Sequence, residues 1–201
     1  MYKFKRILAI LAIFGALMVP NPVKASDVPV AKVNIGAPFT YFDLSDIYHQ
    51  RWVSTYLRGK PTIILTGHRY QRYEILKWAE AFRMEYQNTG KAHVLWVVNL
   101  RKCPWNTSRE TVYNQWRTFN SSVPVLLDWD GVVGKSLRVN YNVPNIIVLD
   151  AYGRLVMHEM HTYNESVYGA VSARIKQFAA NGMDLTGPRK KQKKGRRSDS
   201  F

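Results

Sequence analysis

Residues 143–155 read VPNIIVLDAYGRL, and this stretch decides the fold. The apolar, β-branched run at residues 146–149 is typical of a buried strand. Residues 150–153 (DAYG) are common in tight turns, so the chain should fold back over residues 154–158. The stretch therefore predicts a β-hairpin.

Three more segments of the chain have the pattern of strands. Residues 62–65 (TIIL) and 94–100 (VLWVVNL) are apolar runs typical of buried strands. Residues 123–127 form another short run, and the alternating aromatic residues 39–42 (FTYF) predict a short strand near the start of the domain.

Helices are predicted between these strands. Apolar residues recur at spacings of three and four over residues 70–86, and Ser45 can cap a helix that reaches about residue 57. A capping box at residues 107–110 (TSRE) and a capping residue, Asn164, predict two further helices. This order predicts an α/β fold in which helices on both faces cover a mixed central sheet.

The positive charge of the chain is concentrated at its two ends. The 201 residues carry a formal net charge of +15, of which +4 lies in residues 1–25 and +6 in residues 188–201. Residues 26–187 keep only +5, so they form a mildly basic domain of ordinary composition. Nucleic-acid binding is therefore an unlikely function of this domain.

Residues 1–25 have the pattern of a secretory signal peptide. Three basic residues within the first six precede a run of thirteen apolar residues, and residues 23–25 (VKA) place small side chains before a cleavage point after Ala25. Thirteen residues are shorter than the ~20 that a membrane-spanning helix needs. We predict a periplasmic or secreted protein; the alternative is an uncleaved anchor.

Residues 188–201 are basic and almost free of apolar side chains, so we predict a disordered tail. Such a tail can contact an anionic membrane or cell-wall surface, or remain solvated without a specific partner. The contacting side chains would be Arg189, Lys190, Lys191, Lys193, Lys194, Arg196 and Arg197.

The order of these elements resembles the thioredoxin-like superfamily, and within it the exported TlpA-like and peroxiredoxin-like branch. The residues that carry the resemblance are 36–40 (GAPFT), 57–61 (LRGKP), 124–131 (PVLLDWDG) and 143–155. Together they span about residues 35–180. The resemblance implies a three-layer sandwich with a mixed central sheet.

The Cys-x-x-Cys pair of that family is absent. Counted from Gly59, its two positions fall on Gln71 and Glu74, and the only cysteine of the chain is Cys103. A carboxamide and a carboxylate cannot exchange disulfides. The resemblance therefore implies a degenerate active site without dithiol chemistry.

The same resemblance implies a binding groove. Pro144 aligns with the family's cis-proline, so we expect a cis bond there and a peptide platform at Val143; the alternative is that Pro144 only begins a strand. Basic residues at the start of the helix after the central strand can hold an anion, or form an exposed basic loop. The predicted groove residues are Gly67, His68, Arg69, Tyr70, Gln71, Glu74, Val143 and Pro144.

Cys103 is the only candidate catalytic thiol. It follows a strand, at the edge where α/β sheets usually bind ligands, and its neighbours Arg101 and Lys102 would make it more reactive. It supports a single-cysteine thiol oxidoreductase or peroxidase as an alternative function. The other interpretation is an inert, partly buried cysteine.

Residues 157–161 (MHEMH) contain ligands typical of copper sites. Side chains alternate along a strand, so these ligands should divide between two faces. We therefore predict no metal and no cofactor.

Together these patterns predict an exported thioredoxin-fold protein that acts as a binding or envelope-assembly module without dithiol redox chemistry. The expected partner is a protein or peptide, and exposed aromatic residues such as Trp105 and Trp129 are candidate contacts.

Overall fold

The computed structural model describes residues 34–180 except 136 and 138. The predicted signal peptide, residues 1–25, and the basic tail, residues 188–201, lie outside the described residues. No helix in the described part of the chain is long and apolar enough to cross a membrane.

One mixed sheet forms the centre of the molecule, in the order β2-β1-β5-β4-β3-β6-β7. β3, β4 and β5 run parallel, whereas β6 pairs antiparallel with both β3 and β7. The β1–β2 hairpin joins the opposite edge antiparallel to β5. The strands are β1 (Asp43–Asp46), β2 (Arg51–Val53), β3 (Thr62–Gly67), β4 (His93–Asn99), β5 (Val125–Asp128), β6 (Asn145–Leu149) and β7 (Leu155–Met160).

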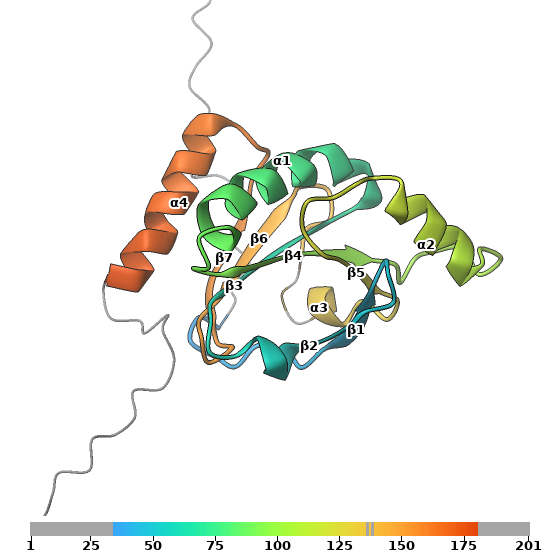
Figure 1. Ribbon diagram of the computed structural model, residues 1–201, viewed down its shortest axis with the longest axis horizontal. Coiled ribbons are helices and arrows are strands. Elements are labelled where there is room, and N and C mark those ends of the chain that lie inside the picture. Colours follow the sequence, from blue (N-terminus) through green and yellow to red (C-terminus); the bar gives the residue numbers. More distant parts are fainter. Residues whose placement is uncertain (1–33, 136, 138, 181–201) are drawn as a thin grey trace, which may run out of the picture.

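Helices cover both faces of the sheet. One face holds α1 (Arg72–Phe82), α2 (Arg109–Arg117) and α4 (Glu165–Ala180), while α3 (Val132–Lys135) lies on the other (Figure 1). Short helical turns, η1 (Ser54–Leu57) and η2 (Arg69–Gln71), precede β3 and α1, and α1 continues as the π-helical turn η3 (Arg83–Gln87). The predicted three-layer α/β sandwich is confirmed.

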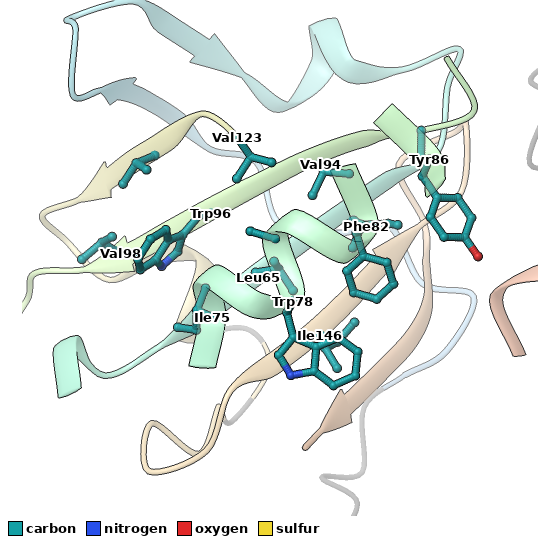
Figure 2. Packing of buried hydrophobic residues seen from close by; sticks show 14 of the residues in the cluster. Leu65, Ile75, Trp78, Phe82, Tyr86, Val94, Trp96, Val98, Val123 and Ile146 are labelled. Atoms are coloured by element: carbon teal, nitrogen blue, oxygen red, sulfur yellow. The ribbon is translucent and has the colours of Figure 1, made fainter. Parts of the chain in front are cut away.

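The alternation of side chains along the strands builds two cores. Ile63 and Leu65 face α1, whereas Ile64 between them faces α3. On the first face Trp78 and Phe82 are fully buried, and their rings stack with centroids 5.4 Å apart over the sheet (Figure 2). Burial of such large rings makes α1 the main cover of this face.

The N-terminal part of the domain differs from the prediction. Residues 39–42 form no strand, and residues 45–57 form the β1–β2 hairpin and η1 in place of a helix. The reason is the buried carboxylate of Asp46, whose Oδ1 accepts hydrogen bonds from the backbone N–H groups of Tyr48 and Gln50 at 2.8 and 2.9 Å. These bonds fix a tight turn that a helix would not allow.

Candidate functional site

An open cavity of about 650 Å³ lies at the carboxyl ends of β3 and β4. Its wall comes from the β3–α1 junction, the β4–α2 loop, α2 itself, the region of α3 and the loop before β6. Ligands of α/β folds usually bind outside the carboxyl ends of central strands. The cavity is therefore the candidate functional site.

The β3–α1 junction is tied to the loop that precedes β6. The backbone N–H of His68 donates to the carbonyl oxygen of Tyr141 at 3.0 Å, and Gln71 Nε2 donates to the carbonyl oxygen of Asn142 at 2.8 Å. Gln71 occupies the first of the two positions at which the family resemblance expects cysteine. Its carboxamide thus holds two walls of the site together.

Asn145 holds the loop before β6 in place. Its fully buried side chain donates from Nδ2 to the carbonyl oxygens of Asn140 and Val143, at 2.8 and 2.7 Å. On its other side Oδ1 pairs with His158 Nε2 at 3.0 Å. A single amide therefore determines where Tyr141 enters the cavity wall.

Tyr141 lines the cavity, with its hydroxyl beside Asn99 and Gly134. Asn99 Nδ2 donates a hydrogen bond to its hydroxyl oxygen, and burial raises the pKa of Tyr141, so the phenol stays protonated at neutral pH. A Cβ on Gly134 would lie 1.6 Å from that oxygen. Only glycine at position 134 leaves room for this phenol.

The β4–α2 loop is ordered by its own polar groups. Asn99 Oδ1 accepts a hydrogen bond from the backbone N–H of Arg101 at 3.0 Å, and the backbone N–H of Cys103 donates to the carbonyl oxygen of Leu100 at 2.8 Å. The capping residue of α2 is Ser108, which accepts from the backbone N–H of Thr111 at 3.1 Å. The predicted cap at Thr107 is wrong by one residue, since Ser108 can make the same bond.

The cavity wall combines positive charge with an apolar surface. Leu100, Val112, Trp116 and Phe119 form the apolar part, and the ring of Trp116 packs edge-on against Trp96, with centroids 5.2 Å apart. No aspartate or glutamate is among the described residues that line the cavity. The basic lining residues are His68, Arg69, Arg72, Arg101, Lys102 and Lys135.

Aromatic rings position two of these basic side chains, Arg69 and Arg72. The guanidinium of Arg72 lies 4.9 Å from the ring centroid of Tyr73 and 4.8 Å from that of Phe119. The guanidinium of Arg69 lies 5.1 Å from the ring centroid of Tyr70. Within the described part of the chain, none of the six basic lining residues forms a salt bridge. The five arginine and lysine side chains among them therefore carry positive charges without a salt-bridge partner in that part of the chain.

The structure brings several of the predicted site residues together. His68, Arg69 and Cys103 line the cavity. Gly67 lies between two other predicted groove residues, Gln71 and Pro144. A Cβ on Gly67 would be 3.6 Å from Gln71 Cβ and 3.7 Å from Pro144 Cα.

Two other predicted residues point elsewhere. Tyr70 has 72 % of its surface exposed, and its ring lies tilted against that of His68, with ring centroids 4.6 Å apart. Glu74 lies outside the cavity, where its carboxylate accepts from the backbone N–H of Tyr163 at 3.1 Å and pairs with Lys77 at 2.8 Å. Glu74 therefore joins α1 to the segment before α4.

The expectation of a cis bond before Pro144 is wrong. No peptide bond among the described residues is cis. Both backbone groups of Val143 are used within the chain, the N–H by the carbonyl oxygen of Asn140 at 3.4 Å and the carbonyl oxygen by Asn145 Nδ2. Pro144 precedes β6 directly, in agreement with the alternative that it begins a strand.

Sequence reasoning missed Lys135 and Tyr141 as members of the site. Both lie in segments that are not close to Cys103 or His68 in the sequence, so only the topology of the sheet brings them together. The available signal was their position after β5 and before β6, since both connections belong to the same edge of the sheet.

The ligand-rich residues 157–161 do not converge on a metal. His158 is buried against Asn145, while Glu159 is engaged by Arg174 and, at 3.0 Å, by His161. No group of three or more His, Cys, Asp or Glu side chains in the described part of the chain is arranged to hold a metal ion.

Solved structures with the same architecture align with this chain over nearly the whole of their own length. The exposed lipoprotein thioredoxin Etrx1 of Streptococcus pneumoniae aligns with a TM-score of 0.55 at 19 % identity, over 69 % of this chain and 99 % of its own. The chain has the thioredoxin-like fold.

Further neighbours share this thioredoxin-like fold. A putative thiol:disulfide interchange protein DsbE of Chlorobium tepidum gives a TM-score of 0.58 at 12 % identity, over 72 % and 97 % of the two chains. Copper-bound yeast Sco1 gives a TM-score of 0.52 at 20 % identity, over 69 % of this chain and 92 % of its own. No family model matches the sequence, and no curated protein matches it. These neighbours confirm the predicted thioredoxin-like fold, and the chain has a single cysteine.

Proposed function

We propose that this chain is an exported thioredoxin-fold protein that binds a ligand in the cavity and has no dithiol redox activity. The observation that carries the proposal is the β3–α1 junction, which borders a formed cavity but has Gln71 and Glu74 at the two expected cysteine positions. A ligand site without a dithiol supports binding as the function.

Both replacement residues have structural contacts that support this proposal. Gln71 links α1 to the loop before β6, and Glu74 links α1 to the segment before α4. Disulfide exchange requires an attacking thiolate and a sulfur leaving group, and neither side chain supplies one. These contacts stabilise the scaffold around the cavity.

Export is the second part of the proposal. One neighbour of the same fold is described as an exposed lipoprotein, and residues 1–25 have the pattern of a signal peptide. Appearance of the protein in a periplasmic or culture fraction, shortened by residues 1–25, is the expected result of cell fractionation with mass spectrometry. Recovery of the uncut chain from the cytoplasm contradicts export.

The absence of redox function is tested with two enzyme assays on the purified full-length protein. We expect no reduction of insulin disulfides by dithiothreitol beyond the uncatalysed rate, and no peroxide consumption beyond that of a free thiol. Catalysed turnover in either assay overturns the proposal.

A single-cysteine thiol oxidoreductase is the second candidate function, because Cys103 is a free thiol in the cavity wall. This candidate requires that any thiol activity is lost in Cys103→Ser. Retention of that activity in Cys103→Ser excludes Cys103 as its source.

A protein partner remains part of the proposal. Trp105, in the β4–α2 loop directly after the lining residue Pro104, has 97 % of its surface exposed. Exposed aromatic side chains are enriched at protein interfaces. If Trp105 contacts the partner, Trp105→Ser weakens partner capture from an envelope fraction, while Trp105→Phe retains it. Equal capture by the two variants argues against this contact.

A further inference from the structure

We propose that the cavity binds a small organic anion, in which a phosphate or carboxylate group is attached to an apolar body. This inference deepens the proposed binding function and depends on it.

Positive side chains gather around the cavity. Five permanently cationic side chains line the cavity, and no acidic residue lines it in the described part of the chain. Residues 26–187 carry a net charge of +5, which is the excess of their basic over their acidic side chains. The number of cations around the cavity equals this excess. Like charges around one opening raise the local potential and attract anions. The five are Arg69, Arg72, Arg101, Lys102 and Lys135.

Two guanidinium groups of the cavity are positioned by aromatic rings and have no salt-bridge partner among the described residues. Arg72 lies against the rings of Tyr73 and Phe119, and its Nε is buried without a hydrogen-bond partner among the described residues. A guanidinium without a carboxylate partner is suited to an oxygen-rich anion, because hydrogen bonds between two charged groups are the stronger ones. Arg69 is placed in the same way by Tyr70.

Part of the cavity wall is apolar. Its accessible apolar surface comes mainly from the half-buried Leu100 and Phe119, since Val112 and Trp116 line the cavity with only 4 % and 5 % of their surfaces exposed. An inorganic anion would leave this apolar surface in contact with water, whereas an aromatic or aliphatic group would cover it. The cavity volume of about 650 Å³ is in the range of small-molecule sites.

The wall favours a small molecule over a peptide that pairs with the backbone of Val143, as the family resemblance implied. The backbone N–H and carbonyl of Val143, which the resemblance assigns to a bound peptide, are both hydrogen-bonded inside the chain. A peptide would have to displace Asn140 and Asn145 to pair there.

The test is isothermal titration of the full-length protein with four probes at neutral pH and low salt. Phenyl phosphate and benzoate carry both parts of the proposed ligand, inorganic phosphate carries only the anion, and phenol only the apolar part. We expect saturable binding at one site for phenyl phosphate or benzoate, and the tighter of the two identifies the anionic group. Inorganic phosphate and phenol should each bind at least about tenfold more weakly.

Charge variants locate the site. Arg101→Gln and Lys102→Gln each remove the charge of an exposed lining side chain that forms no salt bridge among the described residues, and each should weaken binding about three- to tenfold. Lys91→Gln is the matched control, because Lys91 is exposed near the start of β4, at the opposite end of that strand. Its affinity should stay within about twofold of the unchanged protein.

Three titration outcomes overturn the inference. These are equal binding of phenol and phenyl phosphate, equal binding of inorganic phosphate and phenyl phosphate, and no saturation by phenyl phosphate or benzoate up to about 10 mM. Unchanged affinity in both Arg101→Gln and Lys102→Gln also overturns it. The proposed function fails separately, through turnover in the insulin or peroxide assay, whatever these titrations show.

Discussion

Asn145 shows how much one buried side chain contributes to the candidate site. It has no exposed surface, and its amide holds the backbone of Asn140 and Val143 on one side and His158 on the other. Removing a buried amide leaves several of these groups without partners. Stability and the shape of the cavity therefore depend on the same residue.

Asn145→Leu should lower the free energy of unfolding by about 3 kcal/mol, because several buried polar groups lose their hydrogen bonds. Urea unfolding measures this change. Asn106→Leu is the control, since Asn106 is exposed, and it should change stability by less than about 0.5 kcal/mol. Equal stability of the two variants would show that the Asn145 network is not formed.

His158 should make stability depend on pH. Burial lowers the pKa of His158, so the folded state keeps the imidazole neutral while the unfolded chain takes up a proton near pH 6.5. The unfolded state then binds more protons, and stability falls as the pH drops from about 7.5 to 5.5, by at most about 1.4 kcal/mol per pH unit for this group.

His158→Gln tests this assignment, because glutamine can still donate to Asn145 Oδ1 but does not titrate. The slope of unfolding free energy against pH should decrease in His158→Gln and remain in the control His49→Gln, where the side chain is exposed. Burial also lowers the pKa of His93, which supplies part of the slope that remains. An unchanged slope in His158→Gln contradicts the prediction.

At the scale of elements, the contact between η3 and α4 depends on Glu85. Its carboxylate accepts hydrogen bonds from Tyr168 at 2.5 Å and Ser172 at 2.9 Å, and pairs with Lys176 at 2.5 Å. Burial raises the pKa of Glu85, but these three partners outweigh it, and the net pKa is lowered. The carboxylate is therefore charged at neutral pH and fixes α4 to the π-helical turn.

Glu85→Ala should destabilise the fold by about 2 kcal/mol, because Tyr168 and Ser172 lose their shared acceptor. Glu80→Ala is the matched control one and a half turns earlier, where the carboxylate forms an exposed ion pair with Arg83 at 2.5 Å. Its cost should stay below about 1 kcal/mol, as for most surface pairs. Thermal unfolding of both variants checks the difference; an equal loss would contradict the role of Glu85.

Elements with strong local patterns could be predicted, and elements that depend on distant partners could not. The apolar runs of β3, β4 and β6 identified these strands, and the helical spacing identified α1. β1 was missed because its side chains have no strand alternation and its pairing with β5 is set far away in the sequence. The buried carboxylate of Asp46, which fixes the hairpin, resembles a surface turn residue when only the sequence is read.

The candidate site was predictable in its place but not in its composition. Gly67 ends β3, and His68 to Gln71 and Cys103 follow strands whose carboxyl ends form one edge, which the family resemblance already implied. Each basic residue of the wall is ordinary in its own loop, and only the folded chain shows that Lys135 joins Arg69, Arg72 and Lys102. Charge convergence is a property of the topology.

At the scale of the whole molecule, a ligand that fills the cavity should stabilise the entire fold. Its wall includes residues that follow β3, β4 and β5, so an occupied site links the centre of the sheet to α1, α2 and α3. A ligand present at about 100 times its dissociation constant, bound only by the folded state, adds about 2.7 kcal/mol to the free energy of unfolding. For a domain of this size the expected rise in Tm is about 5–10 °C.

Phenyl phosphate or benzoate, whichever binds more tightly, should produce this rise in a thermal scan, and phenol at the same concentration should not. Because the effect depends on occupancy, Lys102→Gln should show a smaller rise at equal ligand concentration, while Lys91→Gln should show the full rise. Sodium chloride screens exposed charges, so the rise should also shrink as its concentration increases. A rise of the same size in all variants and at all salt concentrations would place the ligand on another surface of the fold.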